Sequence, residues 1–233
     1  AMKAIVLFSG GMDSTTLLAQ ALQQHNEVIA LSVLYGSKHN EVESEAAENI
    51  CDYYDVQRIK LNLDFNAWGF KSNLLTSGGD IPEGHYADES MSSTVVPFRN
   101  GILLSIATGI AESIDASVVY YGAHGGDHPI YPDCRPEFVQ AMREAITTGT
   151  DGKVTLDAPF SNIEKTAIAR LGNDLQVPFD KTWSCYQPVA TGGGYVHCGR
   201  CGTCVERIEA FTDAGVTDPT SYQITVTPMR TGF

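Results

Sequence analysis

Basic residues are scarce in this chain. Its 233 residues include 15 lysines and arginines against 28 aspartates and glutamates, which gives a formal net charge of -13. Such an excess of negative charge repels a phosphate backbone unless the positive residues are gathered in one place. The composition therefore argues against DNA or RNA as a partner.

Long apolar segments are also missing. No stretch approaches the roughly 18 apolar residues of a membrane helix, and residues 2–8 lead straight into a glycine-rich motif without the cleavage site of a signal peptide. We therefore expect a soluble cytoplasmic protein that makes no contact with a membrane. With 43% hydrophobic residues, the chain can bury one substantial core and a small appendage rather than two full domains.

Two common nucleotide-binding motifs, G-x-x-x-x-G-K-[S/T] and G-x-G-x-x-G, are absent. A different glycine motif, SGGMDS, occupies residues 9–14. It lies between a β-branched apolar run that predicts a buried strand and a segment with the apolar spacing of a helix. The unpaired N–H groups and the dipole at the start of such a helix favour an anion, so the position predicts a phosphate site.

The residue types of this motif suit a phosphate site. Two adjacent glycines, Gly10 and Gly11, let the backbone close on a phosphate. Ser9 and Ser14 can donate hydroxyl hydrogens to it, and Asp13 can orient a donor or hold Mg²⁺. A plain glycine turn with a serine N-cap would use the glycines equally well, but it leaves Asp13 and the paired serines without a role.

Strand patterns alternate with helix patterns along most of the chain. Strands are predicted at residues 2–8, 27–33, 56–63 and 116–122, and helices at 15–24, 40–54, 99–114 and 136–146. This alternation predicts an α/β fold with a doubly wound parallel sheet. Residues 64–94 show no clear period, and we interpret them either as a lid or as a disordered insertion, since loops of this length are uncommon without a function.

Four of the six cysteines lie close together near the carboxy terminus, at Cys185, Cys198, Cys201 and Cys204. Clustered thiolates in a cytosolic protein indicate metal ligation rather than disulfides. Their number and type favour a tetrahedral Zn²⁺, and an iron-sulfur cluster is the alternative. With all four positions taken by protein, the metal would be structural. The glycines at 192–194 predict the tip of a hairpin within this region.

Three polar segments follow predicted strands or open predicted helices, at residues 35–39, 96–100 and 122–135. Ligands of such sheets bind at the carboxyl ends of the strands, so we expect these segments to share one cleft. Lys38 and Arg99 can neutralise a phosphate or a carboxylate, and either Asp127 or Asp133 can pair with the N–H edge of a purine. A surface ion pair or a helix cap would explain any one of them alone. Lys165, at the start of a predicted helix, is either a solvated helix residue or a ligand of ATP.

The SGGMDS loop resembles that of the PP-loop ATP pyrophosphatases, which cleave ATP between the α- and β-phosphates and transfer AMP to an oxygen of a substrate. Nearly the whole chain is similar to one of their families, the 7-cyano-7-deazaguanine (preQ0) synthases. This resemblance rests on SGGMDS (9–14), YGSKH (35–39), VPFRN (96–100), YPDCRPEF (131–138), TWSCY (182–186), HCGRCGTCVER (197–207) and AGVTDPTSY (214–222).

The resemblance implies a homodimer that binds ATP, Mg²⁺ and a structural Zn²⁺ and acts on 7-carboxy-7-deazaguanine. The carboxylate is adenylated, ammonia converts the acyl-adenylate to an amide, and a second activation by ATP allows dehydration to the nitrile. We divide the chain accordingly into a PP-loop ATP-binding domain at residues 1–181 and a zinc-binding subdomain at 182–233.

Site residues are assigned on the same basis. Catalysis is assigned to Ser9, Asp13, Ser14, Lys38 and Arg99. ATP binding is assigned to Phe8, Ser9, Gly10, Gly11, Met12, Asp13, Ser14 and Lys165. Substrate binding is assigned to Arg99, Asn100, Asp127, Tyr131, Asp133 and Arg135. The metal ligands are the four clustered cysteines.

Three places depart from the family pattern. Ser37 stands where the family has Gln, Phe98 stands where it has Gly, and residues 122–134 read GAHGGDHPIYPDC where the family has a segment near GVNAVDYSGYPDC. We expect all three in the substrate cleft. They leave activation by ATP intact but open a second outcome, in which the reaction stops at 7-amido-7-deazaguanine for a DNA-modification pathway.

Two other functions fit part of the sequence. A tRNA-modifying PP-loop enzyme, such as a thiolase or a lysidine synthetase, would share the loop, but the net charge of -13 and the lack of a basic RNA-binding module weigh against it. A zinc-dependent binding module with a vestigial loop would share the cysteines. The intact Ser9, Asp13 and Ser14 argue against that module.

Overall fold

A five-stranded parallel sheet forms the centre of the molecule. The structure is a computed structural model, and it describes residues 2–86 and 88–223. The strands are β1 (Lys3–Leu7), β2 (Glu27–Leu34), β3 (Gln57–Asn62), β4 (Ala116–Tyr120) and β5 (Thr155–Asp157). They lie in the order β3-β2-β1-β4-β5, and every neighbouring pair is parallel. The predicted doubly wound sheet is thereby confirmed.

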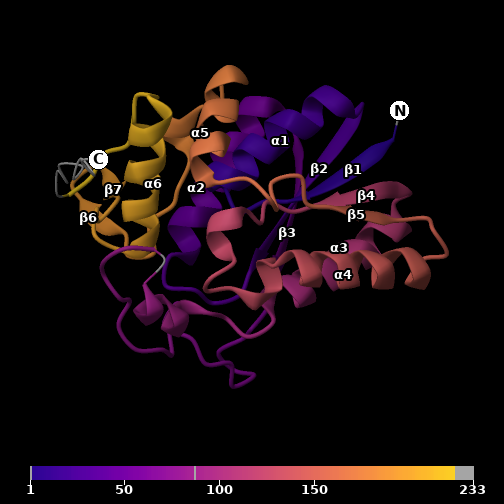
Figure 1. Ribbon diagram of the computed structural model, residues 1–233, viewed down its shortest axis with the longest axis horizontal. Helices are drawn as coiled ribbons and strands as arrows, with labels where there is room; N and C mark the ends of the chain where they lie inside the picture. The colour runs from indigo at the N-terminus through magenta and orange to yellow at the C-terminus, as the bar shows by residue number, and fades with distance from the viewer. Residues whose placement is uncertain (1, 87, 224–233) are drawn as a thin grey trace.

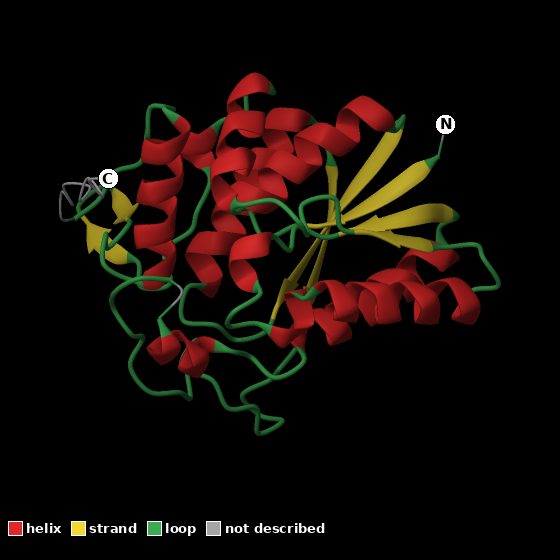
Figure 2. Cartoon of the chain, viewed as in Figure 1, coloured by secondary structure: helices red, strands yellow, loops and turns green. Residues whose placement is uncertain are grey.

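Helices cover both faces of this sheet (Figure 1, Figure 2). One face carries α1 (Met12–Gln24), α2 (Asn40–Tyr54) and α5 (Lys165–Asp174). The other carries α3 (Arg99–Ser113) and α4 (Pro136–Gly149). The helices predicted at 40–54 and 99–114 correspond to α2 and α3, and both begin at the predicted residue.

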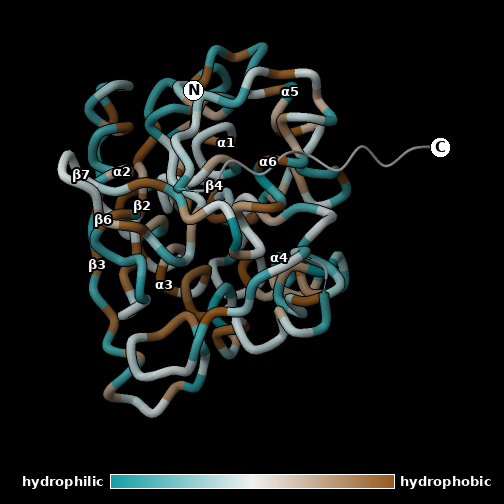
Figure 3. The backbone as a smooth tube through the Cα atoms, turned by 90° about the vertical axis from the view of Figure 1, so that its left-hand side faces the viewer, coloured by the Kyte–Doolittle hydropathy of each residue, from teal (hydrophilic) through white to brown (hydrophobic). Residues whose placement is uncertain are grey.

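Each face of the sheet has its own core because successive residues of a strand point to opposite sides. Along β1, Ala4 and Val6 pack toward α1 and α2, whereas Ile5 packs toward α3. Strand β2 is buried at every residue except its first, which explains why its sequence is almost continuously apolar. In Figure 3 the hydrophobic residues lie mainly toward the middle of the molecule and the hydrophilic ones toward its outside.

The order of the strands reverses at β1. Strands β2 and β3 extend the sheet on one side of β1, and β4 and β5 extend it on the other. In open α/β sheets a ligand binds at the carboxyl ends of the strands beside such a reversal. The segment that leaves β1 there contains the SGGMDS motif, and the segment that leaves β4 contains the polar residues 122–135.

The carboxy-terminal part of the chain packs beside α5. It contains a hairpin of β6 (Val189–Thr191) and β7 (Gly194–Val196), followed by α6 (Gly202–Ala214), which contacts α5. The hairpin confirms the predicted tip at 192–194. Short 3-10 helices lie at η1 (Glu89–Thr94), η2 (Gly125–Asp127), η3 (Pro132–Cys134) and η4 (Phe179–Lys181).

The long connection at 64–94 is folded against the rest of the protein in its described residues. Phe65, Leu74 and Leu75 are fully buried and share a core with Trp183 and the clustered cysteines. The structure therefore supports a packed loop rather than a disordered insertion. None of the described helices is long and apolar enough to cross a lipid bilayer.

Candidate active site

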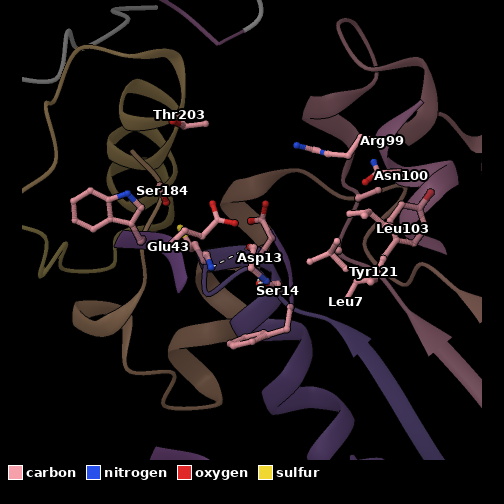
Figure 4. A pocket seen from close by; sticks show the side chains of 18 of the residues that line it. Leu7, Asp13, Ser14, Glu43, Arg99, Asn100, Leu103, Tyr121, Ser184 and Thr203 are labelled. Atoms are coloured by element: carbon pink, nitrogen blue, oxygen red, sulfur yellow. Dashed lines mark hydrogen bonds between the residues drawn. The ribbon is translucent and has the colours of Figure 1, made fainter. Parts of the chain in front are cut away.

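A pocket opens where the carboxyl ends of β1, β2 and β4 meet, at the reversal of strand order. Phe8, Tyr35 and Tyr121 directly follow these three strands and belong to its lining. In Figure 4, Asp13 and Ser14 lie in the middle of the pocket. Figure 4 also shows side chains on two sides of them, with Arg99, Asn100, Leu103 and Tyr121 on one side and Glu43, Ser184 and Thr203 on the other.

The phosphate loop directly after β1 is held by its own serines. The hydroxyl oxygens of Ser9 and Ser14 lie 3.2 Å apart, and the N–H of Gly11 donates to Ser9 Oγ at 3.2 Å. Helix α1 begins at Met12, and Gly11 as its N-cap offers no side-chain hydrogen bond. The first N–H groups of α1 are thus uncapped by a side chain, and together with the helix dipole they suit an anion.

Gly10 in this loop is needed for close packing. Its φ of +84° is left-handed, and a Cβ there would lie 2.7 Å from the backbone nitrogen of Ala47 in α2. The carbonyl of Gly10 accepts the N–H of Trp183 at 2.9 Å. The loop is therefore fixed between α2 and the carboxy-terminal part, and Gly10 supports the pocket from behind.

A charged cluster of ionisable side chains lies beside the phosphate loop. It consists of Asp13, His124, Asp127, Lys165 and Glu206. Lys165 Nζ lies 3.1 Å from Asp13 Oδ2 and 3.3 Å from Glu206 Oε1. His124 Nε2 lies 3.4 Å from Asp13 Oδ2, 3.5 Å from Asp127 Oδ1 and 3.8 Å from Glu206 Oε1. One ammonium and one imidazole are therefore shared among three carboxylates.

Burial and mutual charge shift the pKa values of the charged cluster. Burial acts to raise the pKa of Asp13, but Lys165 and His124 outweigh it and leave that pKa lowered. Burial raises the pKa of Glu206 to about 7, which Lys165 and His124 offset only in part. Asp13 and Lys165 thus form an ion pair at neutral pH, whereas Glu206 titrates close to neutrality.

His124 is held in one orientation by its own turn. The N–H of Gly126 donates to His124 Nδ1 at 3.1 Å, so the proton of the neutral ring lies on Nε2, which faces the carboxylates. Burial acts to lower the pKa of His124, but Asp127 and then Asp13 outweigh it and raise that pKa. Protonation of Nδ1 would break the bond from Gly126, which limits this rise.

A second group of polar side chains also lines the pocket. Arg99 NH1 donates to the hydroxyl of Tyr35 at 2.9 Å, and the guanidinium lies 5.6 Å from the centre of that ring. The side chain of Arg99 points from α3 into the pocket (Figure 4). His39 Nε2 lies 3.0 Å from Glu43 Oε2 on the first turn of α2. These groups can orient an anion and exchange a proton.

Contacts at the start of α3 hold Arg99 and Asn100 in place. The N–H of Asn100 donates to Asp133 Oδ2 at 2.8 Å, and its side-chain amide donates to Cys134 Sγ at 3.2 Å. Burial raises the pKa of the Cys134 thiol, so this sulfur is protonated at neutral pH. Cys134 is therefore a packing and hydrogen-bonding partner rather than a thiolate nucleophile.

The four clustered cysteines can hold a metal ion. Their sulfurs are buried and lie within 4.8 Å of one another. The Cys198–Cys204 and Cys185–Cys201 sulfur pairs are each 3.9 Å apart. Four sulfurs at about 2.3 Å from one tetrahedral ion would be about 3.8 Å apart, so the arrangement fits such an ion. The N–H groups of residues 187, 198, 200 and 201 donate to these sulfurs, as is usual around metal-bound thiolates.

A family model for the queuosine biosynthesis protein QueC matches residues 3–215. The chain belongs to the QueC family. It is 49% identical over 220 residues to the 7-cyano-7-deazaguanine synthase of Porphyromonas gingivalis, with 94% of this chain and 97% of that protein covered. The 7-cyano-7-deazaguanine synthase of Desulfotalea psychrophila is 48% identical, with 95% of this chain and 99% of that protein covered.

A solved structure shares the fold of this QueC chain. A 4-thiouridine synthetase, in a complex with RNA and bound ATP, superposes with a TM-score of 0.54 at 17% identity. The match covers 92% of this chain and 50% of the synthetase chain. At this identity the likeness shows a common architecture, which agrees with the PP-loop fold expected from SGGMDS.

Most of the site residues predicted for this QueC chain lie at the pocket. The predicted ATP-site residues in its lining are Phe8, Ser9, Gly11, Met12, Asp13, Ser14 and Lys165. The predicted substrate-site residues in its lining are Arg99, Asn100, Asp127 and Tyr131. Lys165 is only 9% exposed, so it is not the solvated helix residue that was the alternative.

Other predicted residues lie outside the lining of the pocket. The ammonium of Lys38 donates to the carbonyl of Gly79 in the 64–94 loop, because the turn that carries it faces that loop. Arg135 is exposed, and its Nε donates to the carbonyl of His128 at 3.0 Å. Asp133 and Gly10 act behind the pocket, through α3 and α2. The structure therefore corrects the placement of Lys38 and Arg135, which it does not bring to the site.

Several pocket residues had been given no role. His39 belongs to the 35–39 segment expected at the cleft, and it lies four residues before Glu43, a spacing that could have identified the two as a pair. Glu206 follows the last clustered cysteine by two residues, so the metal motif itself brings it to the pocket. Tyr86 and Trp183 reach the pocket through tertiary packing, which no local sequence pattern predicts.

Two of the three departures from the QueC pattern lie outside the pocket. Phe98 has a φ of +50°, a left-handed conformation that explains the family's glycine. Its ring is exposed, lies over Gly101 and contacts the ring of Phe138, with centroids 5.9 Å apart. Ser37 is buried and pairs with Leu75 in an isolated bridge. The expectation that all three departures line the cleft holds only for the 122–134 segment.

Proposed function

We propose that this QueC chain uses ATP and ammonia to convert 7-carboxy-7-deazaguanine into 7-cyano-7-deazaguanine. The observation that carries the proposal is an uncapped phosphate loop that shares one pocket with Arg99. The loop suits the phosphates of ATP, and Arg99 suits a carboxylate. Membership of the QueC family supports this substrate, since relatives with nearly full coverage carry the name of that synthase.

Activation by ATP answers a chemical need. A carboxylate resists attack by ammonia because oxide is a very poor leaving group, and transfer of AMP to a carboxylate oxygen supplies a good one. The pocket must then hold two anions close together, which demands positive groups aimed at them. Lys165 beside the loop and Arg99 from α3 meet that demand. Asp13 and Asp127 offer the carboxylate oxygens that Mg²⁺ prefers, and the ion would screen the remaining negative charge.

The second half of the reaction reuses the same ATP site. The amide oxygen is adenylated by a second ATP, both hydrogens leave the nitrogen, and AMP departs as the carbon–nitrogen triple bond forms. The pocket must retain a neutral amide for this step. Asn100 is fixed by its hydrogen bond to Cys134, and Tyr131 is fixed by its hydrogen bond to Thr94. Both side chains can hold a neutral purine-like base.

We also propose that the clustered cysteines bind one structural Zn²⁺ and that residues 182–233, of which 224–233 lie outside the described residues, belong to a subdomain built on it. Four buried sulfurs with no open ligand position support a structural rather than a catalytic ion. The family resemblance further supports a cytoplasmic homodimer, which sedimentation velocity of the purified protein would test.

The reaction can be tested directly by product mass. Purified protein is incubated with Mg-ATP, ammonium and 7-carboxy-7-deazaguanine, and the products are followed by mass spectrometry over time. We expect an amide that forms first and then loses the mass of one water, with AMP and pyrophosphate released at each step. The Asp13→Ala variant serves as the inactive control. An amide that accumulates and is not consumed when supplied as substrate would instead make this protein an amide synthase.

A further inference from the structure

A buried histidine–carboxylate pair lines the pocket at the start of α2, next to the phosphate loop. His39, the N-cap residue of α2, is 4% exposed, and Glu43 lies one turn along the same helix. His39 Nε2 lies 3.0 Å from Glu43 Oε2. The carboxylate accepts the Nε2 hydrogen, which fixes the tautomer and leaves a lone pair on Nδ1.

The Nδ1 atom of His39 is the unusual feature of this pair. It is buried, and it has no hydrogen-bond partner among the described residues. Buried polar atoms are nearly always paired in folded proteins, so an unpaired buried acceptor on a residue that lines the pocket points to a ligand that donates a hydrogen. Glu43 on the opposite side of the ring can stabilise the imidazolium that forms if that hydrogen is transferred.

The surroundings of His39 favour a small cation. The ring of Tyr186 lies 5.3 Å from that of His39, centroid to centroid, at an interplanar angle of 38°. Tyr35 and Glu43 both belong to the pocket lining, and the charge of Glu43 acts on the Tyr35 hydroxyl. Aromatic faces and a buried carboxylate attract a cation, and the N–H groups of ammonium would meet the Nδ1 lone pair. The ionisable groups around the part of the pocket that His39 lines are Glu43, Tyr35, Tyr186 and Arg99.

We propose that His39 and Glu43 form the ammonia site of the reaction, with His39 Nδ1 as the base that converts ammonium to ammonia. This inference rests on the proposed function, because it names the group that supplies its nucleophile. Ammonium is the main species at neutral pH and has no lone pair with which to attack. Activation by ATP supplies the leaving group but no free ammonia. A base beside the acyl-adenylate supplies the ammonia by taking a proton from ammonium.

His39 Nδ1 takes one proton from ammonium, and the nitrogen of the resulting ammonia forms a bond to the carbonyl carbon of the acyl-adenylate. The bond between that carbon and the phosphate oxygen breaks, and AMP leaves with the second proton on its phosphate. The amide stays in the pocket, and imidazolium His39 returns its proton to water.

The position of the pair agrees with this role. Arg99 donates to Tyr35, which directly follows β2 and precedes His39 by four residues, and Arg99 and His39 both line the pocket. In Figure 4, Glu43 and Arg99 lie on opposite sides of Asp13. An acyl-adenylate held on the phosphate loop would therefore lie between Arg99 and the His39–Glu43 pair.

The test separates formation of the acyl-adenylate from its capture. His39→Gln keeps an N–H group for the bond to Glu43 but has no basic nitrogen, and Glu43→Gln keeps an acceptor but removes the charge. His25→Gln, the same chemical change at the end of α1 and outside the pocket lining, is the matched control. For each protein, isotope exchange between pyrophosphate and ATP in the presence of 7-carboxy-7-deazaguanine measures adenylation. Amide formation is then measured with ammonium and, separately, with hydroxylamine, which is largely unprotonated at neutral pH and needs no base.

We expect His39→Gln to keep the exchange reaction within about twofold while its rate with ammonium falls about 100-fold, the usual contribution of a general base. Hydroxamate formation should fall by much less, and raising the pH should restore the rate with ammonium as free ammonia accumulates. Glu43→Gln should give a smaller loss of the same kind, and His25→Gln should match the unsubstituted protein.

Two results would overturn the inference alone. One is an unchanged rate with ammonium in His39→Gln, and the other is an equal loss with both nucleophiles, which would show that His39 only shapes the pocket. Retained exchange in the same preparation shows that the variant is folded at its ATP site. If the unsubstituted protein shows no exchange that depends on the carboxylate, the proposed function itself fails, and the ammonia site fails with it.

Discussion

Replacing Lys165 with methionine tests whether one ammonium holds the charged cluster together. Lys165 Nζ is buried between Asp13 and Glu206, at 3.1 Å and 3.3 Å from their oxygens. Methionine keeps most of the length of the side chain and none of its charge. Removing one partner of a buried ion pair costs about 3–5 kcal/mol because the other charge is left uncompensated. We expect a loss near the lower end, about 3 kcal/mol at pH 8, because His124 still faces both carboxylates.

The loss in Lys165→Met should depend on pH. In the unsubstituted protein the pKa of Lys165 is raised. The contribution of Lys165 to stability is therefore complete at every pH below the pKa of an unfolded lysine, and it does not change across the neutral range. In the variant, Asp13 and Glu206 lose the ammonium and keep only His124 as a partner, and the pKa values of these carboxyl groups should lie above their unfolded values. The folded state then holds protons that the unfolded state releases, so the stability of the variant falls as pH rises and recovers as pH falls.

Urea denaturation at about pH 5.5 and about pH 8 measures both effects through the free energy of unfolding. Trp183, one of two tryptophans in the chain, lines the pocket and reports its opening by fluorescence. The control is Lys165→Met combined with Glu206→Gln, which should regain part of the stability at the higher pH but no adenylation activity. A single variant that is as stable as the unsubstituted protein, or that loses equally at both pH values, would refute this account of the cluster.

The remaining predictions concern the loop, the metal and the strained aromatic residue. Asp13→Ala or Ser14→Ala should abolish pyrophosphate exchange while the circular dichroism spectrum stays unchanged, and near-normal turnover in either variant would contradict the PP-loop assignment. Atomic emission should find about one zinc per chain, and Cys204→Ser should lose the metal and destabilise the carboxy-terminal region, whereas a brown protein absorbing near roughly 400 nm would indicate an iron-sulfur centre. Phe98→Gly should leave kcat/KM within about twofold, since the ring lies outside the pocket and its left-handed backbone costs only about 1–2 kcal/mol; a tenfold loss would show that the ring reaches the substrate.

The fold could be predicted because its signals are local. Strand β2 is almost continuously apolar because both of its faces are covered, and a run of this kind is readable in one window. Helix α2 spans the residues predicted for it, since an acidic segment with apolar Ala47 and Ile50 on one face has helical spacing. Strand β5 was not predicted, because a strand of three residues is too short to show a period.

Local patterns could predict the site only where it is contiguous in sequence, and its other residues were assigned from the family resemblance. The phosphate loop occupies one turn, so its motif carries the whole geometry. The two lysines show the limit of this approach. Lys38 lies in a polar motif next to a strand yet bonds the 64–94 loop, whereas Lys165 begins a helix that packs against α1 and so meets Asp13, 152 residues away. Such a meeting depends on how helices dock, which no local pattern determines.

The departure at residue 124 acts on the charge beside the phosphate loop, which both adenylation steps use. The family pattern has asparagine where this chain has His124, and His124 Nε2 faces Asp13, Asp127 and Glu206, with the nearest of these oxygens at 3.4 Å. Its ring therefore alters the charge balance beside the phosphate loop and at Asp127, while Asn100 keeps its own hydrogen bonds. Both adenylation steps use that loop, so a change there acts on the carboxylate and on the amide alike. Selective arrest at the amide would need a change beside the retained amide group, and neither Ser37 nor Phe98 lines the pocket. Ser37 and Phe98 thus give no structural reason for an amide end point, and the nitrile stays the expected product.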